Sequence, residues 1–229
     1  MSAIDEEKRA AARAALDELP LAGLVGLGSG TTARLFVEEL APLVRAGRKL
    51  LGVPSSESTR ALAASLGIPL LSDEGPWALA VNVDGADEVS ARLDLIKGGG
   101  AAHTREKILN YAAARNVIIV DDGKLSRQLG EKWAVPVEVL VFAQGATRAH
   151  LETLGTPVLR TKSGALVRTD AGNLIVDLTT GPIEDPGELD RRLRAIPGVV
   201  ETGLFVQRAD VVLVAGGAGV RRLTRAVLT

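Results

Sequence analysis

Carboxylates gather where one apolar segment of the chain ends. Residues 81–84, VNVD, alternate as a buried strand does, and the turn that follows carries Asp84 and Asp87 three positions apart across Gly85 and Ala86. Such a turn can aim both carboxylates into one cleft, where carboxyl groups can exchange protons with a bound molecule. The alternative is a solvated strand end, because Asp is common in turns and before helices.

A run of three glycines lies between a lysine and another carboxylate. Residues 96–107, IKGGGAAHTREK, put Lys97 directly before the glycines and Glu106 after them. A glycine costs about 1 kcal/mol in a regular element, so three together indicate a loop of special geometry or of close ligand approach. We expect Thr104 to cap the following helix, Glu106 to lie in its first turn, and His103 to pack or cap rather than to catalyse.

A third segment has the composition of an anion-binding loop. Residues 26–32, GLGSGTT, place glycines and hydroxyl side chains before a predicted helix, whose N-terminus offers free N–H groups. The segment lacks the Gly-Lys-Ser/Thr ending of a P-loop, and its third glycine is misplaced for a dinucleotide fingerprint. It predicts a phosphate site, the alternative being a glycine turn with an ordinary Ser/Thr cap. Lys124, in DDGK, could be a second cation for a phosphate or a surface lysine in a turn.

The composition excludes several classes of function. The net charge is −1, so no basic field would attract nucleic acid or an anionic membrane. There is no cysteine, and His103 and His150 are the two histidines, which excludes thiolate chemistry and Cys/His metal sites but leaves a carboxylate-held cation open. No apolar run reaches the roughly 18 residues of a membrane span, and the charged N-terminal segment does not resemble a signal peptide. We therefore expect a cytoplasmic protein.

The elements that must position these residues alternate as in a parallel α/β fold. The predicted strands are GLVGLG, LLGVP, LAVNVD, NVIIVDD and DVVLVAGG, with helical patterns between the first four. We expect one Rossmann-like sheet with helices on both faces. Ligands of such sheets bind beyond the carboxyl ends of the strands, where we place the loops GLGSGTT, PSSEST, VDGADE, KGGGAAHTRE and VDDGK.

The segment between the last two of these strands has another organisation. Its predicted order is strand-helix-strand-strand-helix-strand, the order of a ferredoxin-like domain. We therefore predict a Rossmann-like catalytic domain of residues 1–133 and 205–229, with a ferredoxin-like α/β domain, residues 134–204, inserted into it.

Seven segments together resemble ribose-5-phosphate isomerase of type A. They are VGLGSGTTA, VDGADEV, IKGGGAAHTREKI, DDGK, PVEVL, GNLIVDL and IPGVVETGLF, in order over nearly the whole chain. The resemblance implies a Rossmann-like domain that carries the site and a ferredoxin-like insert. It also implies an isomerase of the pentose phosphate pathway that interconverts ribose 5-phosphate and ribulose 5-phosphate through an enediolate. No metal or cofactor is implied, and the implied assembly is a homodimer or homotetramer.

The resemblance also implies roles for single residues. Glu106 would be the base that moves a proton between C1 and C2, while Asp84, Asp87 and Lys97 would bind the sugar hydroxyls, assist ring opening and stabilise the oxyanion. The other implied substrate-binding residues, mainly at the phosphate end, are Ser29, Gly30, Thr31, Thr32, Lys124 and Lys8, with Gly85, Ala86, Gly98, Gly99 and Gly100 beside the sugar.

Three other functions compete with this prediction. A sugar-phosphate deaminase would need a similar phosphate loop and carboxylates. A non-catalytic sugar-phosphate sensor would keep the loop without needing Glu106 or Lys97, and it should carry a DNA-binding module. The sequence has no basic helix-turn-helix segment. A nicotinamide dehydrogenase is disfavoured by the imperfect glycine fingerprint.

Overall fold

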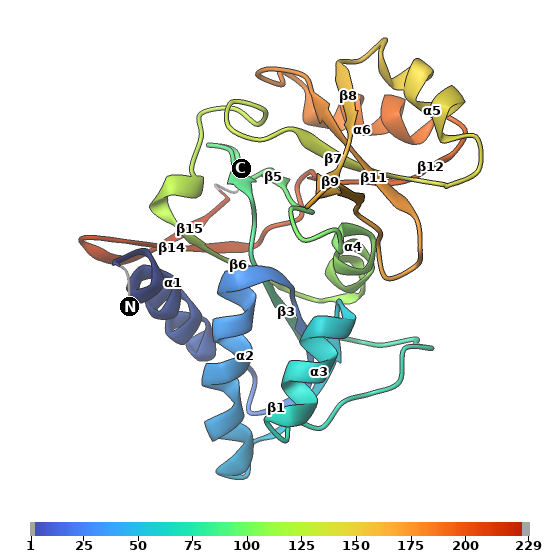
Figure 1. Ribbon diagram of the computed structural model, residues 1–229. Coiled ribbons are helices and arrows are strands. Elements are labelled where there is room, and N and C mark those ends of the chain that lie inside the picture. The colour runs from blue at the N-terminus through green and yellow to red at the C-terminus, as the bar shows by residue number, and fades with distance from the viewer. Residues whose placement is uncertain (1–2, 226–229) are drawn as a thin grey trace. The chain divides into compact units, whose positions relative to one another are not determined.

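A computed structural model describes residues 3–225 of the chain (Figure 1). The described residues divide into two compact units. Unit 1 takes its residues from 1–86, 105–124 and 208–229, and unit 2 consists of Asp87–Thr104 and Leu125–Gln207. The predicted domain boundaries at 133/134 and 204/205 stay a prediction.

Unit 1 is built on a six-stranded sheet with the order β15-β14-β6-β3-β1-β2. Its strands are β1 (Ala22–Leu27), β2 (Lys49–Pro54), β3 (Val81–Asp84), β6 (Asn116–Asp121), β14 (Val211–Gly216) and β15 (Gly219–Thr224). Neighbours from β2 to β14 pair in parallel, whereas β15 is an antiparallel edge strand that the sequence patterns did not predict. The predicted Rossmann-like parallel sheet is confirmed.

Helices cover both faces of this sheet, because alternate strand residues point to opposite sides. The helical segments are α1 (Ala3–Ala14), the 3-10 helix η1 (Ala15–Glu18), α2 (Gly30–Arg45), α3 (Glu57–Ser65), α4 (His103–Ala112) and the 3-10 helix η2 (Asp122–Lys124). Phe36 of α2 packs in one apolar core with Val25 of β1. Leu109 of α4 packs with Val53 of β2 in a second core. The sheet is therefore the middle of three layers, as predicted.

Unit 2 contains a four-stranded antiparallel sheet with the order β12-β7-β11-β8. Its elements are β7 (Val135–Val139), α5 (Gln144–Leu151), β8 (Thr156–Leu159), the short strands β9 (Thr161–Lys162) and β10 (Ala165–Leu166), β11 (Leu174–Thr179), α6 (Pro186–Arg194) and β12 (Val199–Thr202). Apart from the β9–β10 hairpin, this is the β-α-β-β-α-β order of a ferredoxin-like fold, as predicted.

A second, small sheet in unit 2 corrects two expectations. It joins β4 (Glu88–Val89), β5 (Leu95–Ile96) and β13 (Leu204–Phe205) in the antiparallel order β13-β5-β4. The segment VVETGLFV is therefore two strands in different sheets, not one final strand. The loop KGGGAAHTRE follows β5, so it does not extend from the parallel sheet where we had placed it. Strands of two residues have too few positions to show any alternation in sequence.

No helix within residues 3–225 is long and apolar enough to cross a membrane.

Candidate active site

In unit 1, four polar loops lie at one edge of the sheet. They follow the parallel strands β2, β1, β3 and β6, which are adjacent, so their carboxyl ends meet at that edge. The hydroxyl oxygens of Ser29 and Ser55, from the first two of these strand–helix loops, lie 2.6 Å apart. The predicted convergence of GLGSGTT, PSSEST, VDGADE and VDDGK is confirmed.

Asp84 binds the backbone of this edge. Its side chain is buried, and its Oδ1 accepts hydrogen bonds from the N–H groups of Ser29 at 3.0 Å and of Gly85 at 2.8 Å. The N–H of Ser29 is therefore directed at a carboxylate, which leaves the hydroxyl of Ser29 as the group that can contact an anion. Asp84 is thus a structural anchor of the loop as well as a candidate substrate ligand.

Two glycines of GLGSGTT are required by packing against β3. A Cβ atom at Gly28 would lie 2.1 Å from Oδ1 of Asp84, and one at Gly26 would lie 2.4 Å from Oδ1 of Asn82. Gly30 differs, since its φ of +90° favours glycine although nothing lies within 4 Å of its would-be Cβ. Packing and backbone conformation therefore account for all three glycines, and none of them requires the close approach of an anion as an explanation.

The N-terminus of α2 has the features of an anion site. Ser29 is the N-cap residue and has an extended backbone, but its side chain makes no capping hydrogen bond. The alternative of an ordinary serine cap is therefore wrong. Thr31 is exposed, whereas Thr32 is buried, with 9% of its surface exposed. Free N–H groups and these hydroxyls could hold a phosphate.

Glu106 lies in the first turn of α4, as predicted, and only 4% of its surface is exposed. The prediction for Thr104 is wrong. The helix begins at His103, so Thr104 lies inside it, and its hydroxyl donates to the carboxylate of Glu138 instead of capping. Two candidate phosphate ligands, Lys124 at the end of η2 and Lys8 on α1, are half-buried.

In unit 2, Asp87 organises the triple glycine. Its Oδ2 accepts the N–H of Gly99 at 2.7 Å, and a Cβ at Gly99 would lie 2.7 Å from its Oδ1. Gly98 has a φ of +111°, and a Cβ there would lie 2.7 Å from Nδ1 of His103. Nothing lies within 4 Å of a Cβ at Gly100. Internal packing thus explains Gly98 and Gly99, and only Gly100 still needs another reason.

Lys97 is a buried cation in unit 2. Its side chain is 3% exposed, and its Nζ lies 5.5 Å from the centroid of the Phe205 ring. Its N–H donates to the carbonyl of Gly203 at 2.9 Å, which fixes the backbone from which the side chain projects. An ammonium group removed from water interacts strongly with any negative charge brought near it.

Sequence reasoning missed Arg160. Its Nη1 donates to the carbonyls of Gly98 at 2.6 Å and Gly99 at 3.1 Å, and its Nε donates to Asp177 at 2.9 Å. Arg160 therefore holds the glycine loop from the side of β8. A lone arginine in the segment TPVLRT carries no signal that could have found this.

Two other ionisable residues beside the motifs have structural roles. Glu88 is fully buried and accepts the N–H groups of Gly130 and Lys132 at 2.9 and 3.0 Å. His103 is also fully buried, with its Nε2 3.3 Å from the carbonyl of Glu201, so it packs, as predicted. Among residues 3–225, no group of three or more His, Asp or Glu side chains could hold a metal ion.

The predicted site residues fall into two groups, one in each unit. The group in unit 1 is Lys8, Ser29, Gly30, Thr31, Thr32, Asp84, Gly85, Ala86, Glu106 and Lys124, and the group in unit 2 is Asp87, Lys97, Gly98, Gly99 and Gly100. The chain passes between the groups at 86/87 and 104/105.

A parallel sheet that ends in a hydroxyl-rich loop, together with a buried glutamate and a buried lysine, is typical of phosphate-binding α/β enzymes that use acid–base chemistry. The comparisons with known proteins give the family. The model of a family described as ribose 5-phosphate isomerase A (phosphoriboisomerase A) matches residues 51–219. The chain belongs to the ribose-5-phosphate isomerase A family.

Relatives match along the whole chain. Ribose-5-phosphate isomerase A of Bradyrhizobium diazoefficiens is 44% identical, over 97% of each chain. That of Thermococcus kodakarensis is 42% identical over 97% of this chain and 99% of the relative. The solved structure of the enzyme from Methanocaldococcus jannaschii has a TM-score of 0.89 at 39% identity and covers 96% of this chain and 99% of its own. A solved D-ribose-5-phosphate isomerase in complex with phospho-erythronic acid has a TM-score of 0.94 at 38% identity, covering 98% and 100%.

Proposed function

We propose that Glu106 is the base with which this isomerase interconverts ribose 5-phosphate and ribulose 5-phosphate, in the non-oxidative branch of the pentose phosphate pathway. The observation that carries the proposal is the position of Glu106. It is a buried carboxylate in the first turn of α4, and the same unit carries the hydroxyl-rich loop at its sheet edge. Membership of the isomerase family supports the substrate.

The reaction needs one proton acceptor and one stabiliser of negative charge. Glu106 takes the proton from C2 of the open-chain aldose, which leaves an enediolate with its negative charge at O1. The same carboxyl group returns the proton to C1, and O2 becomes the ketone oxygen as its hydroxyl proton passes to O1. A positioned base contributes about 10²–10⁴-fold to such a step. No oxidant or reductant is needed, because atoms and electrons balance within the sugar.

Lys97 stabilises the enediolate in this proposal. Its ammonium group is buried, so its attraction for a developing oxyanion is weakly screened. Asp84 and Asp87 bind sugar hydroxyls and assist ring opening. Both carboxylates are already held by backbone N–H groups, which fixes their orientation before the sugar binds.

The phosphate supplies remote binding energy. Its proposed ligands are the hydroxyl of Ser29, the α2 N-terminus at Gly30, Thr31 and Thr32, and the lysines Lys124 and Lys8. One solved relative holds phospho-erythronic acid, a phosphorylated sugar acid, which supports a ligand of the same kind here. The proposed ligands of the sugar also include the backbones of Gly85, Ala86, Gly98, Gly99 and Gly100.

We further propose a cytoplasmic homodimer or homotetramer that needs no cofactor and binds neither nucleic acid nor membrane. Exposed apolar residues in unit 2 support self-association. Leu140 and Val141 are each 45% exposed and Phe142 is 86% exposed, in one run after β7.

The first test is ribulose 5-phosphate formation in excess chelator by the wild type and by Glu106→Gln. We expect chelator-resistant turnover that falls by about 10²–10⁴-fold in the variant while ribose 5-phosphate still binds. Glu152→Gln, which changes an exposed glutamate after α5, is the control and should keep full activity.

Other results would contradict parts of the proposal. Binding without turnover in the wild type would indicate a sensor, and turnover abolished by chelator would indicate a metal. Full activity of Glu106→Gln would show that another group is the base.

A further inference from the structure

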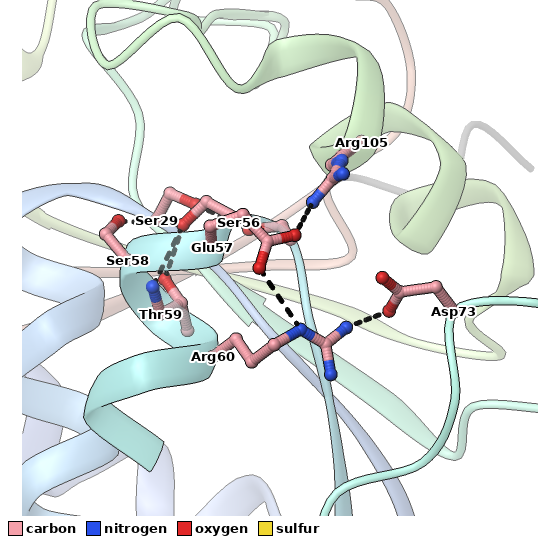
Figure 2. Close-up of polar contacts among 9 residues, drawn as sticks. Ser29, Ser56, Glu57, Ser58, Thr59, Arg60, Asp73 and Arg105 are labelled. Atoms are coloured by element: carbon pink, nitrogen blue, oxygen red, sulfur yellow. Dashed lines mark hydrogen bonds and ion pairs between the residues drawn. The ribbon is translucent and has the colours of Figure 1, made fainter. Parts of the chain in front are cut away.

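The N-terminus of α3 is hydrogen-bonded to the hydroxyl-rich loop of unit 1, GLGSGTT (residues 26–32). The hydroxyl of Thr59 donates to the carbonyl of Gly28 at 3.0 Å, and Ser55, just before the helix, lies within hydrogen-bond distance of Ser29. Ser56 is the N-cap of α3 and accepts the N–H of Thr59 at 3.1 Å (Figure 2). Two hydrogen-bond contacts therefore connect this end of α3 to the candidate phosphate site.

The next residue, Glu57, extends from the same helix end to α4. Its Oε1 lies 2.8 Å from Nη1 of Arg105, and its Oε2 lies 3.5 Å from Nε of Arg60. Arg60 in turn pairs with Asp73 (Figure 2). The four side chains form a continuous chain of ion pairs, Asp73–Arg60–Glu57–Arg105.

Arg105 directly precedes the proposed base. Consecutive residues differ by about 100° around a helix, so Arg105 and Glu106 leave α4 in different directions. A side chain about 6 Å from the helix axis moves by roughly 1 Å when the helix turns by about 10°. Holding Arg105 on one side of the first turn therefore limits the movement of the Glu106 carboxylate on another side.

The ion pair between Glu57 and Arg105 is too exposed to solvent to contribute much to the free energy of unfolding. The side chains of Glu57 and Arg105 are 55% and 35% exposed, and exposed pairs contribute little to folding. Arg105 lines a cavity of about 240 Å³ together with Pro54, Asp73, Trp77, Ile108 and Leu109, so its hydrogen bond to Glu57 at 2.8 Å is what fixes its orientation beside that open space. A contact with little effect on stability but with a fixed geometry is suited to positioning.

We propose that Glu57 and Arg105 are positioning residues, whose ion pair links the loop of Ser29 to the first turn of α4 and holds the Glu106 carboxylate in place for proton transfer. This inference rests on the proposed role of Glu106. It gives a role to two residues that lie within the loops PSSEST and KGGGAAHTRE but were not among the candidate site residues. It also implies that α3 holds the base and the loop of Ser29 in a fixed relative position.

The test is a double-mutant cycle in which kcat and KM are measured for Glu57→Gln, for Arg105→Gln and for the variant that carries both changes. We expect kcat to fall by about tenfold in each, with the KM for ribose 5-phosphate within about twofold, because the base is misplaced and the phosphate contacts stay. The double variant should be no slower than either single one. The primary kinetic isotope effect with ribose 5-phosphate deuterated at C2 should rise, since proton transfer becomes slower than the other steps.

Asp73→Asn is the matched control, because it breaks the Arg60–Asp73 pair of the same chain of ion pairs but leaves Glu57 and Arg105 intact. It should keep the wild-type kcat and isotope effect. Equal losses of kcat in Asp73→Asn, or wild-type kcat in both single variants, would overturn the positioning role.

Glu106→Gln separates the base assignment from the positioning role. If it keeps full turnover, the base assignment fails and this inference with it. If Glu106→Gln is inactive while Glu57→Gln and Arg105→Gln are normal, only the positioning role fails.

Discussion

At the sheet edge of unit 1, Asp84 packs closely against the backbone of Gly28 and Ser29. The carboxylate of Asp84 accepts the N–H of Ser29, and Gly28, the loop residue before Ser29, is a glycine because Asp84 fills the position of its side chain. A substrate ligand and a structural anchor are thus the same group. Replacing Gly28 should disturb the site through Asp84, even though Gly28 itself offers no side chain for chemistry.

Gly28→Ala and Gly100→Ala should therefore behave differently. The new Cβ at Gly28 would lie 2.6 Å from the Cα of Asp84, a backbone atom that cannot move aside, so we expect a loss of about 1–3 kcal/mol in unfolding free energy and of activity. Gly100→Ala meets no atom within 4 Å and should change stability by about 0.5 kcal/mol or less. Urea unfolding and steady-state kinetics measure both.

Gly100→Ala also tests whether this backbone approaches the sugar. A raised KM at unchanged stability would support that role. An unchanged KM would leave Gly100 without a function in binding.

At the scale of elements, the contact between α3 and α4 includes a titratable group. The hydrogen bond from Arg105 holds the pKa of the Glu57 carboxyl below its usual range. The ionised form of Glu57 is thus favoured by folding. Its stabilising effect is fully present above the pKa of an unfolded glutamate and is lost as the pH falls through the lower pKa of the folded state.

The free energy of unfolding of the wild type minus that of Arg105→Gln should accordingly depend on pH. We expect a small positive difference at neutral pH that shrinks as the pH falls below about 4, the ordinary range of glutamate. Urea unfolding at several pH values measures it, and the side-chain NMR titration of Glu57 should move to higher pH in the variant. A difference that grows in acid would contradict the assigned direction of the pKa shift.

At the scale of the whole molecule, unit 2 carries a contiguous run of exposed apolar residues. The run of Leu140, Val141 and Phe142 belongs to unit 2, whereas unit 1 has a comparably exposed leucine in Leu21, which is 87% exposed. A contiguous apolar run indicates an interaction surface, and a single exposed apolar side chain does not.

Light scattering should therefore give a molar mass of two or four times the 23.9 kDa chain for the wild type. Phe142→Ser should lower this mass or make it depend on concentration, and the matched variant Leu21→Ser should leave it unchanged. A wild type that is monomeric at high concentration would exclude the proposed homo-oligomer.

Much of the fold could be predicted because periodic patterns are local. The parallel strands, their helices and the β-α-β-β-α-β order all appeared as runs of alternating or helical residues, and Glu106 was placed correctly in a first helical turn. The failures were short or non-periodic. The two-residue strands β4, β5 and β13 left no pattern, so the loop after β5 was assigned to the wrong sheet. Thr104 had the residue type of a cap, but its partner Glu138 lies 34 positions away.

By itself, the sequence determined the types of group in the site, the strand ends and helix starts that carry them, and the family to which the motifs belong. Only the tertiary structure decided what those groups touch. Asp84 meets the backbone of Ser29 across 55 positions, Arg105 meets Glu57 across 48, and Arg160 reaches Gly98 across 62. Hydrophobic periodicity records which face of an element is buried, whereas a hydrogen bond between distant positions exists only after the packing of strands and helices has brought its donor and acceptor within about 3 Å.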